Sequence, residues 1–185
     1  IISYISKANL SIFKIESKEK NINPYAAFMT STLQLEASNK LNFSPSRTMS
    51  LAQNLYEGIN INGENKGLIT YMRTDSVNLS DDFLHSARNL ISKDFGSSYL
   101  NKEIRYFKNK VKNAQEAHEA IRPSDINIRP NHLPKSLDTD LKKLYDLIWR
   151  RSLATQAKQA ISETTTIKIG DFSKETILSA AETTL

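Results

Sequence analysis

Residues 44–58 read SPSRTMSLAQNLYEG and carry the full signature of an amphipathic helix. Ser44 is a favourable N-cap, because its hydroxyl can accept a backbone N–H of the first turn, and Pro45 suits the first helical position. Gly58 marks the end. The apolar residues that share one face are Met49, Ala52, Leu55, Tyr56 and Ile59. The pattern therefore predicts a helix that packs this face into a core.

Helical periodicity continues on both sides of this stretch. Before it, Ser31 and Gln34 form an S-x-x-Q capping box, which predicts a helix running to about Leu41. After it, Ser80 precedes an acidic first turn and Gly96 stops the helix. The apolar stripe of this third helix is Phe83, Leu84, Ala87, Leu90 and Ile91.

The segments between the helices have the composition of loops. Residues 60–66 are rich in Asn and Gly and predict a loop, whereas residues 68–72 are apolar and favour a short strand. Residues 99–112 are basic and aromatic. Three prolines within residues 122–134 predict an extended linker before a last helix.

The two ends of the chain change to strand patterns. Residues 10–16 alternate apolar and polar side chains, and residues 164–169 and 175–178 read as two strands around a turn at Gly170 and Asp171. We therefore expect an α+β fold, in which a mainly helical domain projects from a β-layer made by the two ends. The expected boundaries are a strand segment at 1–22, a helical domain at 23–159 and returning strands at 160–185.

Composition and charge narrow the class of protein. The 185 residues include no cysteine, so disulfides and thiolate zinc sites are absent, which agrees with a reducing compartment. No apolar run is long enough for a membrane span and no secretory leader is evident, so we expect a cytoplasmic protein that does not contact membranes. The net charge of +5 favours a polyanionic partner.

One tyrosine has neighbours that suit nucleophilic chemistry. Side chains two apart share a face of an extended segment, so Tyr71 and Arg73 are expected to point the same way, with Met72 packed behind them. A phenol has an unperturbed pKa of about 10, and a tyrosine nucleophile therefore needs its developing charge stabilised. The Arg73 guanidinium could do this and bind a phosphate bidentately. The simpler interpretation is a β-edge tyrosine with its hydroxyl in water.

Several motifs resemble those of bacterial DNA topoisomerase I, a type IA topoisomerase, and occur in the order found in that family. Residues 67–76, GLITYMRTDS, resemble the active-site motif, and residues 115–123, QEAHEAIRP, resemble a second signature. Further similarity occurs at residues 30–34, 49–57 and 144–150, so that it covers about 24–159. Met72 is more typical of topoisomerase I than of topoisomerase III. The stretch at 60–66 is longer than in many relatives, but a loop tolerates insertions.

The resemblance implies a reaction and a site. Tyr71 would attack a DNA phosphodiester, keep the 5′ phosphate as a phosphotyrosine and release a 3′ hydroxyl. Strand passage and religation would then relax negatively supercoiled DNA without a nucleotide cofactor. Arg73 is the second implied catalytic residue. The implied DNA-binding residues are Thr70, Thr74, Asp75, Ser76, His118 and Arg122.

The resemblance also implies partners outside this chain. The family holds Mg²⁺ on acidic residues of a toprim domain, so we expect the metal to bind there and no metal ligands here. Asp138 and Asp140 lie at the start of the last expected helix, residues 141–159, where capping explains them. His118 and Glu119 lack the second histidine of H-E-x-x-H. The partners are single-stranded DNA and the remaining domains, and without them we expect weak DNA binding and no covalent adduct.

Other interpretations remain open. His118 could be a surface histidine, and Arg122 could anchor a loop with Glu119 holding it. In tyrosine recombinases the nucleophile follows an H-x-x-R element, whereas Tyr71 precedes an H-x-x-x-R, so the order is wrong. A non-catalytic single-stranded nucleic-acid-binding module is the second alternative. It would use Arg105, Tyr106, Phe107, Lys108, Lys110 and Lys112.

Overall fold

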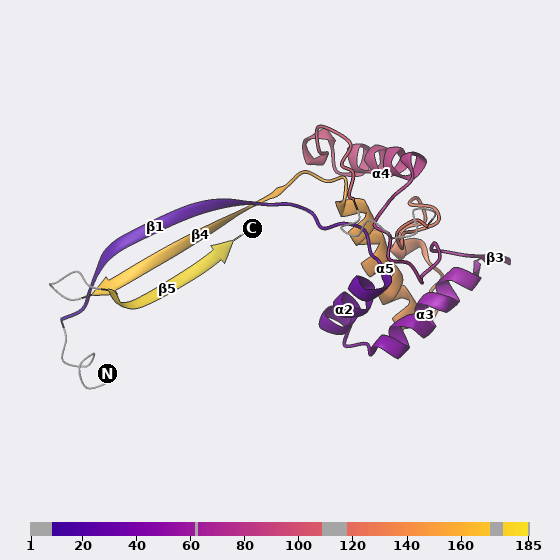
Figure 1. Ribbon diagram of the computed structural model, residues 1–185, viewed down its shortest axis with the longest axis horizontal. Coiled ribbons are helices and arrows are strands. Elements are labelled where there is room, and N and C mark those ends of the chain that lie inside the picture. Colours follow the sequence, from indigo (N-terminus) through magenta and orange to yellow (C-terminus); the bar gives the residue numbers. More distant parts are fainter. Residues whose placement is uncertain (1–8, 62, 109–117, 171–175, 185) are drawn as a thin grey trace. The chain divides into compact units, whose positions relative to one another are not determined.

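The computed structural model describes residues 9–61, 63–108, 118–170 and 176–184, which form two compact units. The sheet unit holds the described residues up to Asn23 and from Gln159 onward, and the helical unit is Pro24–Lys158. Figure 1 shows long strands in the first and helices in the second. The α+β class predicted from the sequence is confirmed.

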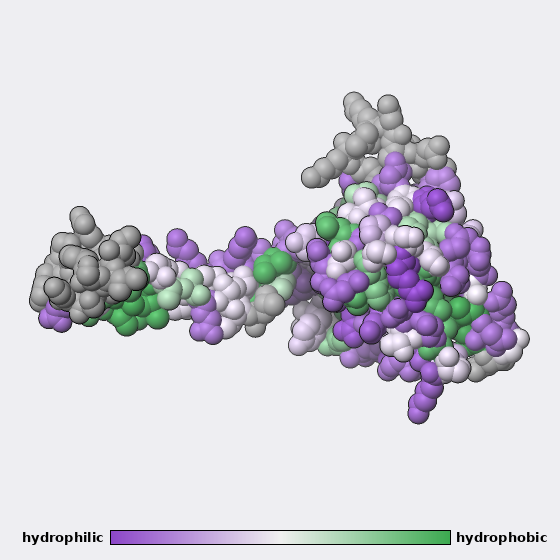
Figure 2. Space-filling view, turned by 90° about the horizontal axis from the view of Figure 1, so that it is seen from below, coloured by the Kyte–Doolittle hydropathy of each residue, from purple (hydrophilic) through white to green (hydrophobic). Residues whose placement is uncertain are grey.

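The sheet unit is a three-stranded antiparallel sheet in the order β1-β4-β5. Ser11 pairs with Gly170 at one end of the β1–β4 ladder, so the two ends of the chain do share a sheet, as their strand patterns predict. Asp171, in the predicted turn, lies outside the described residues. Ile12 and Ile15 are more than half exposed, and Figure 2 shows hydrophobic residues on the visible face of this unit. The strands are β1 Ser11–Ile22, β4 Ala160–Gly170 and β5 Thr176–Thr184.

The described part of the helical unit contains four α-helices, a two-stranded hairpin and two short 3-10 turns. Among these helices, none is long and apolar enough to cross a membrane. The helices are α2 Thr30–Leu41, α3 Pro45–Glu57, α4 Asp81–Asp94 and α5 Thr139–Ala154. The remaining elements are β2 Ile59–Ile61, β3 Glu64–Lys66, η1 Ser97–Tyr99 and η2 Pro130–His132.

Most helix ends form where the sequence places them. Ser44 Oγ accepts the N–H of Arg47 at 3.2 Å, and Asp138 Oδ1 accepts two N–H groups of the first turn of α5. Ser80 precedes α4 as predicted, but its own hydroxyl makes no capping bond. Instead, the Ser80 N–H donates to the Glu119 carboxylate at 3.0 Å, so this helix start is closed by a residue from a distant loop.

The predicted capping box at Ser31 and Gln34 is wrong. The N-cap of α2 is Met29, whose N–H donates to the Thr32 hydroxyl at 3.1 Å. The helix starts earlier because the N–H and hydroxyl of Thr30 bind the segment at 72–74, which fixes the first turn from outside the helix.

Three further predictions need correction. Residues 60, 61 and 64–66 lie in the paired strands β2 and β3 rather than in a loop, and Asn60 Oδ1 accepts the Gly63 N–H where the two strands meet. Residues 68–72 make a single bridge, between Ile69 and Pro123, flanked by hydrogen bonds from the Thr70 N–H to the Arg122 carbonyl and from the Ser124 N–H to the Leu68 carbonyl. Beyond this bridge the Met72 carbonyl binds the Thr30 hydroxyl instead of another strand. The last helix ends at Ala154, five residues before the predicted end at 159.

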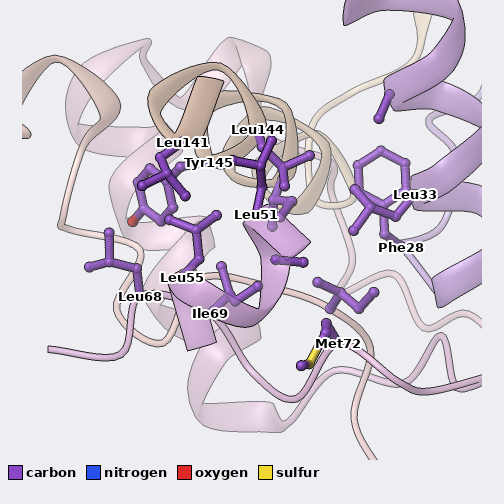
Figure 3. Packing of buried hydrophobic residues seen from close by; sticks show 14 of the residues in the cluster. Phe28, Leu33, Leu51, Leu55, Leu68, Ile69, Met72, Leu141, Leu144 and Tyr145 are labelled. Carbon is purple, nitrogen blue, oxygen red and sulfur yellow. The ribbon is translucent and has the colours of Figure 1, made fainter. Parts of the chain in front are cut away.

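The main core lies where α2, α3 and α5 meet the segment at 68–72. Figure 3 draws Ile69 and Met72 among the buried side chains of this core, together with Leu55 and Leu144. Tyr145 is fully buried there and donates its hydroxyl to the Ile128 carbonyl at 2.7 Å, and burial raises the pKa of this phenol. A second cluster under α4 contains Phe83, Ala87, Leu90, Ile91, Ile126 and Leu153.

Candidate active site

Side chains alternate between solvent and interior along residues 71–76. The exposed set is Tyr71, Arg73 and Asp75, and the buried set is Met72, Thr74 and Ser76. This period of two is that of extended backbone, although the segment is not part of a sheet. The burial of Met72 in the main core therefore turns Tyr71 and Arg73 outward on one face.

An open hollow of about 530 Å³ lies beside Tyr71, and we call it the Tyr71 hollow. Its charged lining comes from Arg73, Asp75 and His118. Within the described residues, none of these three side chains has an ion-pair or hydrogen-bond partner. The hollow thus presents a guanidinium, an imidazole and a carboxylate that are free to meet a ligand. Its other lining residues are Thr30, Ser31, Gln34, Tyr71 and Thr74.

Thr30 holds the C-terminal side of the tyrosine segment. Its hydroxyl donates to the carbonyls of Met72 at 2.8 Å and Thr74 at 3.0 Å, and accepts the Thr74 N–H at 2.9 Å. The Thr30 N–H donates to the same Thr74 carbonyl at 2.9 Å. The backbone that carries Arg73 is therefore fixed to the first turn of α2. No local pattern in the sequence predicts this role.

Thr70 holds the N-terminal side. Its hydroxyl donates to the Ala120 carbonyl at 2.7 Å and accepts the Arg122 N–H at 3.0 Å. The Thr70 N–H donates to the Arg122 carbonyl at 2.9 Å. Tyr71 is thus placed between two threonines whose hydroxyls bind backbone groups far away in the sequence.

Two aromatic rings flank Tyr71, which is itself 41% exposed. The Tyr56 ring lies 5.4 Å away between centroids at 68°, and the His118 ring lies 6.4 Å away at 39°. The helical period predicts Tyr56 on the core face of α3, but it too is 41% exposed. The prediction of its burial is wrong, since Leu51 and Thr48 fill the core there instead.

Arg122 does not line the Tyr71 hollow. Its guanidinium pairs with Glu119, donates to the Pro123 carbonyl at 2.8 Å and lies 4.7 Å over the Phe83 ring. It lines a second hollow of about 220 Å³ near Ser80, which we call the Arg122 hollow. These contacts match the alternative in which Arg122 anchors a loop and Glu119 holds it.

The hydroxyl groups predicted to bind DNA are largely engaged within the protein. Thr74 Oγ1 accepts the Ser76 N–H at 3.1 Å, and Ser76 Oγ accepts the Asn78 N–H at 3.1 Å. Ser76 is fully buried, so in this structure its side chain cannot touch a nucleic acid. The Ser76 hydroxyl thus shapes the backbone after Asp75.

The basic and aromatic run is also partly engaged. Arg105 donates to the carbonyls of Thr155 and Ala157 just past the end of α5, and desolvation lowers the pKa of its guanidinium. Tyr106 donates its hydroxyl to Asp81 at 3.0 Å, which raises the pKa of this phenol. Lys110 and Lys112 lie outside the described residues.

The donor set at the site does not suit a magnesium ion. Asp75 is the one carboxylate among the residues lining the Tyr71 hollow. The part of the chain that the structure describes contains no group of three His, Asp or Glu side chains able to hold a metal. Asp138 is engaged as an N-cap.

Comparisons with known proteins agree with this fold. The family described as DNA topoisomerase matches residues 1–185. The chain is 47% identical to DNA topoisomerase 1 of Rickettsia bellii over 98% of its length and 23% of that protein. It is 51% identical to DNA topoisomerase 1 of Campylobacter jejuni over 83% of its length and 22% of that protein. The solved structure of full-length topoisomerase I from Thermotoga maritima matches with a TM-score of 0.80 and 37% identity, covering 98% of this chain and 29% of that one.

The chain belongs to the DNA topoisomerase family. Its similarity to topoisomerase I proteins places it among the type IA members. It spans less than a quarter of the length of the two curated relatives named above.

Proposed function

We propose that this chain is the part of a type IA DNA topoisomerase that carries the strand-cleaving nucleophile, Tyr71. One observation carries the proposal: Tyr71 and Arg73 are exposed on one face of a segment that Thr30 and Thr70 hold at both ends. A fixed backbone keeps a nucleophile and a cation in one geometry, so little reorganisation is needed in the transition state.

In the proposed reaction the Tyr71 oxygen attacks the scissile phosphorus of a DNA strand. A P–O bond to tyrosine forms, the bond to the 3′ oxygen breaks, and the phenol proton is balanced by the proton that the 3′ oxygen gains. The Arg73 guanidinium would bind the non-bridging phosphate oxygens through two N–H groups. Attack by the 3′ hydroxyl reverses these steps, so no nucleotide is consumed and relaxation of negatively supercoiled DNA follows.

The other site residues divide into two groups. His118 and Asp75 line the hollow with free side chains, and we assign them to contact with the DNA strand. Thr70 and Thr74 have hydroxyls bonded within the protein, and we assign them to positioning of the backbone around Tyr71. Arg122 belongs with the positioning residues, because it pairs with Glu119 and holds the loop that Thr70 binds.

Magnesium belongs, in this proposal, to a toprim domain elsewhere in the same enzyme. When bound there it would supply positive charge at the phosphate. The residues of this chain would hold the strand and deliver the nucleophile. Single-stranded DNA and the remaining domains are the proposed partners, and the cytoplasm is the proposed compartment. By itself the 185-residue chain is expected to form no covalent adduct.

The test is a covalent-adduct assay with the full-length enzyme and an end-labelled single-stranded oligonucleotide. Tyr71→Phe removes the nucleophilic oxygen and should abolish the denaturant-resistant, protease-sensitive band. Tyr99→Phe is a matched control, because Tyr99 is 63% exposed and does not line the Tyr71 hollow. The Tyr99 variant should form the adduct normally. An adduct that survives Tyr71→Phe would overturn the proposal.

The same assay tests the alternative of a nucleic-acid-binding module without chemistry. That alternative used the run from Arg105 to Lys112, but Arg105 binds two backbone carbonyls and Tyr106 binds Asp81. Binding without any Tyr71-dependent adduct in the full-length enzyme would favour the module.

A further inference from the structure

Tyr56 is an exposed aromatic residue beside the proposed nucleophile. It lies in the last turn of α3, whose apolar face is otherwise buried through Leu51, Ala52 and Leu55. Its ring is 41% exposed and meets the Tyr71 ring edge to face at 5.4 Å between centroids. Its hydroxyl has no hydrogen-bond partner among the described residues. Neither the core nor a polar network therefore accounts for a tyrosine at this position.

The backbone that carries Tyr56 is closely fitted to the Tyr71 segment. The Leu68 N–H donates to the Leu55 carbonyl at 2.7 Å. A Cβ at Gly67 would lie 2.7 Å from the Tyr56 carbonyl oxygen, so only glycine allows this approach. The two tyrosines are thus held at a fixed separation by main-chain contacts, independently of their side chains.

Tyr56 does not line the Tyr71 hollow, although it touches Tyr71, which does. If the scissile phosphate lies at Tyr71 and Arg73, the base of an adjoining nucleotide comes within reach of the Tyr56 ring. An exposed ring stacks on a nucleobase of any type, because every base offers a π-face. Tyr56 carries no charge, so a base suits it better than a second phosphate does.

We infer that Tyr56 forms a base-stacking subsite for the nucleotide that adjoins the scissile phosphate. The inference rests on the proposed function, because it takes Tyr71 as the residue that marks the scissile phosphate. The subsite fixes the strand register at Tyr71 without selecting a sequence. The competing role for Tyr56 is that of a prop that only supports the Tyr71 ring.

The experiment is an abasic-site scan of single-stranded DNA binding by the full-length enzyme. All proteins carry Tyr71→Phe, which blocks cleavage and keeps the ring that Tyr56 touches. Tyr56→Phe should bind like the parent, whereas Tyr56→Ala and Tyr56→Leu should bind the intact oligonucleotide about tenfold more weakly. An abasic site at one position next to the cleavage site should weaken DNA binding by the parent protein by a similar factor.

The decisive result is the combination of the two changes. The affinity of Tyr56→Ala and Tyr56→Leu for DNA should not change further when that one position is abasic. An abasic site at any other position should change their affinity as it changes that of the parent. Equal losses on every oligonucleotide, or no loss at all, would overturn the subsite and leave Tyr56 a prop. Tyr99→Ala, at another exposed tyrosine, is the control for non-specific effects. The proposed function is tested separately by the covalent-adduct assay. It fails if the enzyme with an intact Tyr71 forms no adduct that depends on Tyr71.

Discussion

Arg73 in the Tyr71 hollow and Arg122 in the Arg122 hollow differ in how the charge of the guanidinium is satisfied. In the first, Arg73, Asp75 and His118 have no ion-pair partner within the described residues. In the second, the Arg122 guanidinium binds Glu119 and a backbone carbonyl and covers an aromatic ring. A buried charge needs such partners, whereas a charge kept free in a hollow is available to a ligand. Both arginines belong to topoisomerase-like motifs, but only Arg122 has its charge paired within the protein.

The largest expected effect is loss of stability on Arg122→Ala. The side chain is only 14% exposed, and its removal leaves Glu119 without its cation and Phe83 without its cover. We expect the free energy of unfolding to fall by about 3 kcal/mol, measured by urea titration. Arg73→Ala is the matched control and should change it by less than about 0.5 kcal/mol, because Arg73 is exposed. Equal losses for the two variants would erase the contrast between the hollows.

Thr30→Val should have the next largest effect, and it acts on the Tyr71 hollow through the backbone. Valine keeps the shape but leaves the Thr74 N–H and the Met72 carbonyl without the hydroxyl. We expect about 1–2 kcal/mol of lost stability and a cleavage rate of the full-length enzyme lowered about tenfold, because Arg73 loses its fixed position. Thr30→Ser retains the hydroxyl and should restore both. A cleavage rate unchanged by valine would show that this clamp does not matter for the chemistry.

Arg73→Lys should change the chemistry without changing the fold. Lysine keeps the charge but lacks the planar fork that binds two phosphate oxygens. The cleavage and religation rates of the full-length enzyme should therefore change by different factors, and the difference should correspond to roughly 1 kcal/mol of activation free energy. The free energy of unfolding should stay within about 0.5 kcal/mol of that of the parent. Both rates must be measured on the same oligonucleotide. Identical rates would remove Arg73 from the site.

His118→Ala should have the smallest effect. His118 is exposed and has no hydrogen-bond or ion-pair partner among the described residues, so stability should not change. Affinity for single-stranded DNA should fall roughly two- to fivefold, as expected for one exposed contact. The comparison is made at two salt concentrations, since a phosphate contact weakens as salt rises. Equal affinity of variant and parent at both concentrations would assign His118 to the surface.

The sequence predicted what depends on local interactions. The start of α3 at Ser44 and Pro45 and the stop of α4 at Gly96 follow from caps and glycine geometry within a few residues. The start of α2 and the exposure of Tyr56 could not be predicted this way. Both depend on hydrogen bonds and close contacts with residues that are distant in the sequence, such as Thr74.

The candidate site divides in the same way. The exposed pair of Tyr71 and Arg73 follows from the period of two in extended backbone, which the sequence reveals. The engagement of Ser76 and Arg122 depends on where Asn78 and Glu119 come to lie, which is a tertiary property. Thr30 and Tyr56 lie in the family-like stretches 30–34 and 49–57, but nothing in those stretches predicts these particular roles.

The pairing of the chain ends in one sheet has a consequence for the order of folding. The Ser17 hydroxyl is hydrogen-bonded to that of Thr165, 148 positions away in the sequence, and closing so long a loop in an unfolded chain is entropically costly and slow. Folding of the helical unit shortens that loop, because Arg151 in the last turn of α5 binds the Ala26 carbonyl and stacks on Tyr25, close to where β1 ends. We therefore expect pulse-labelled hydrogen exchange during refolding to protect the amides of α5 before those of β1 and β4.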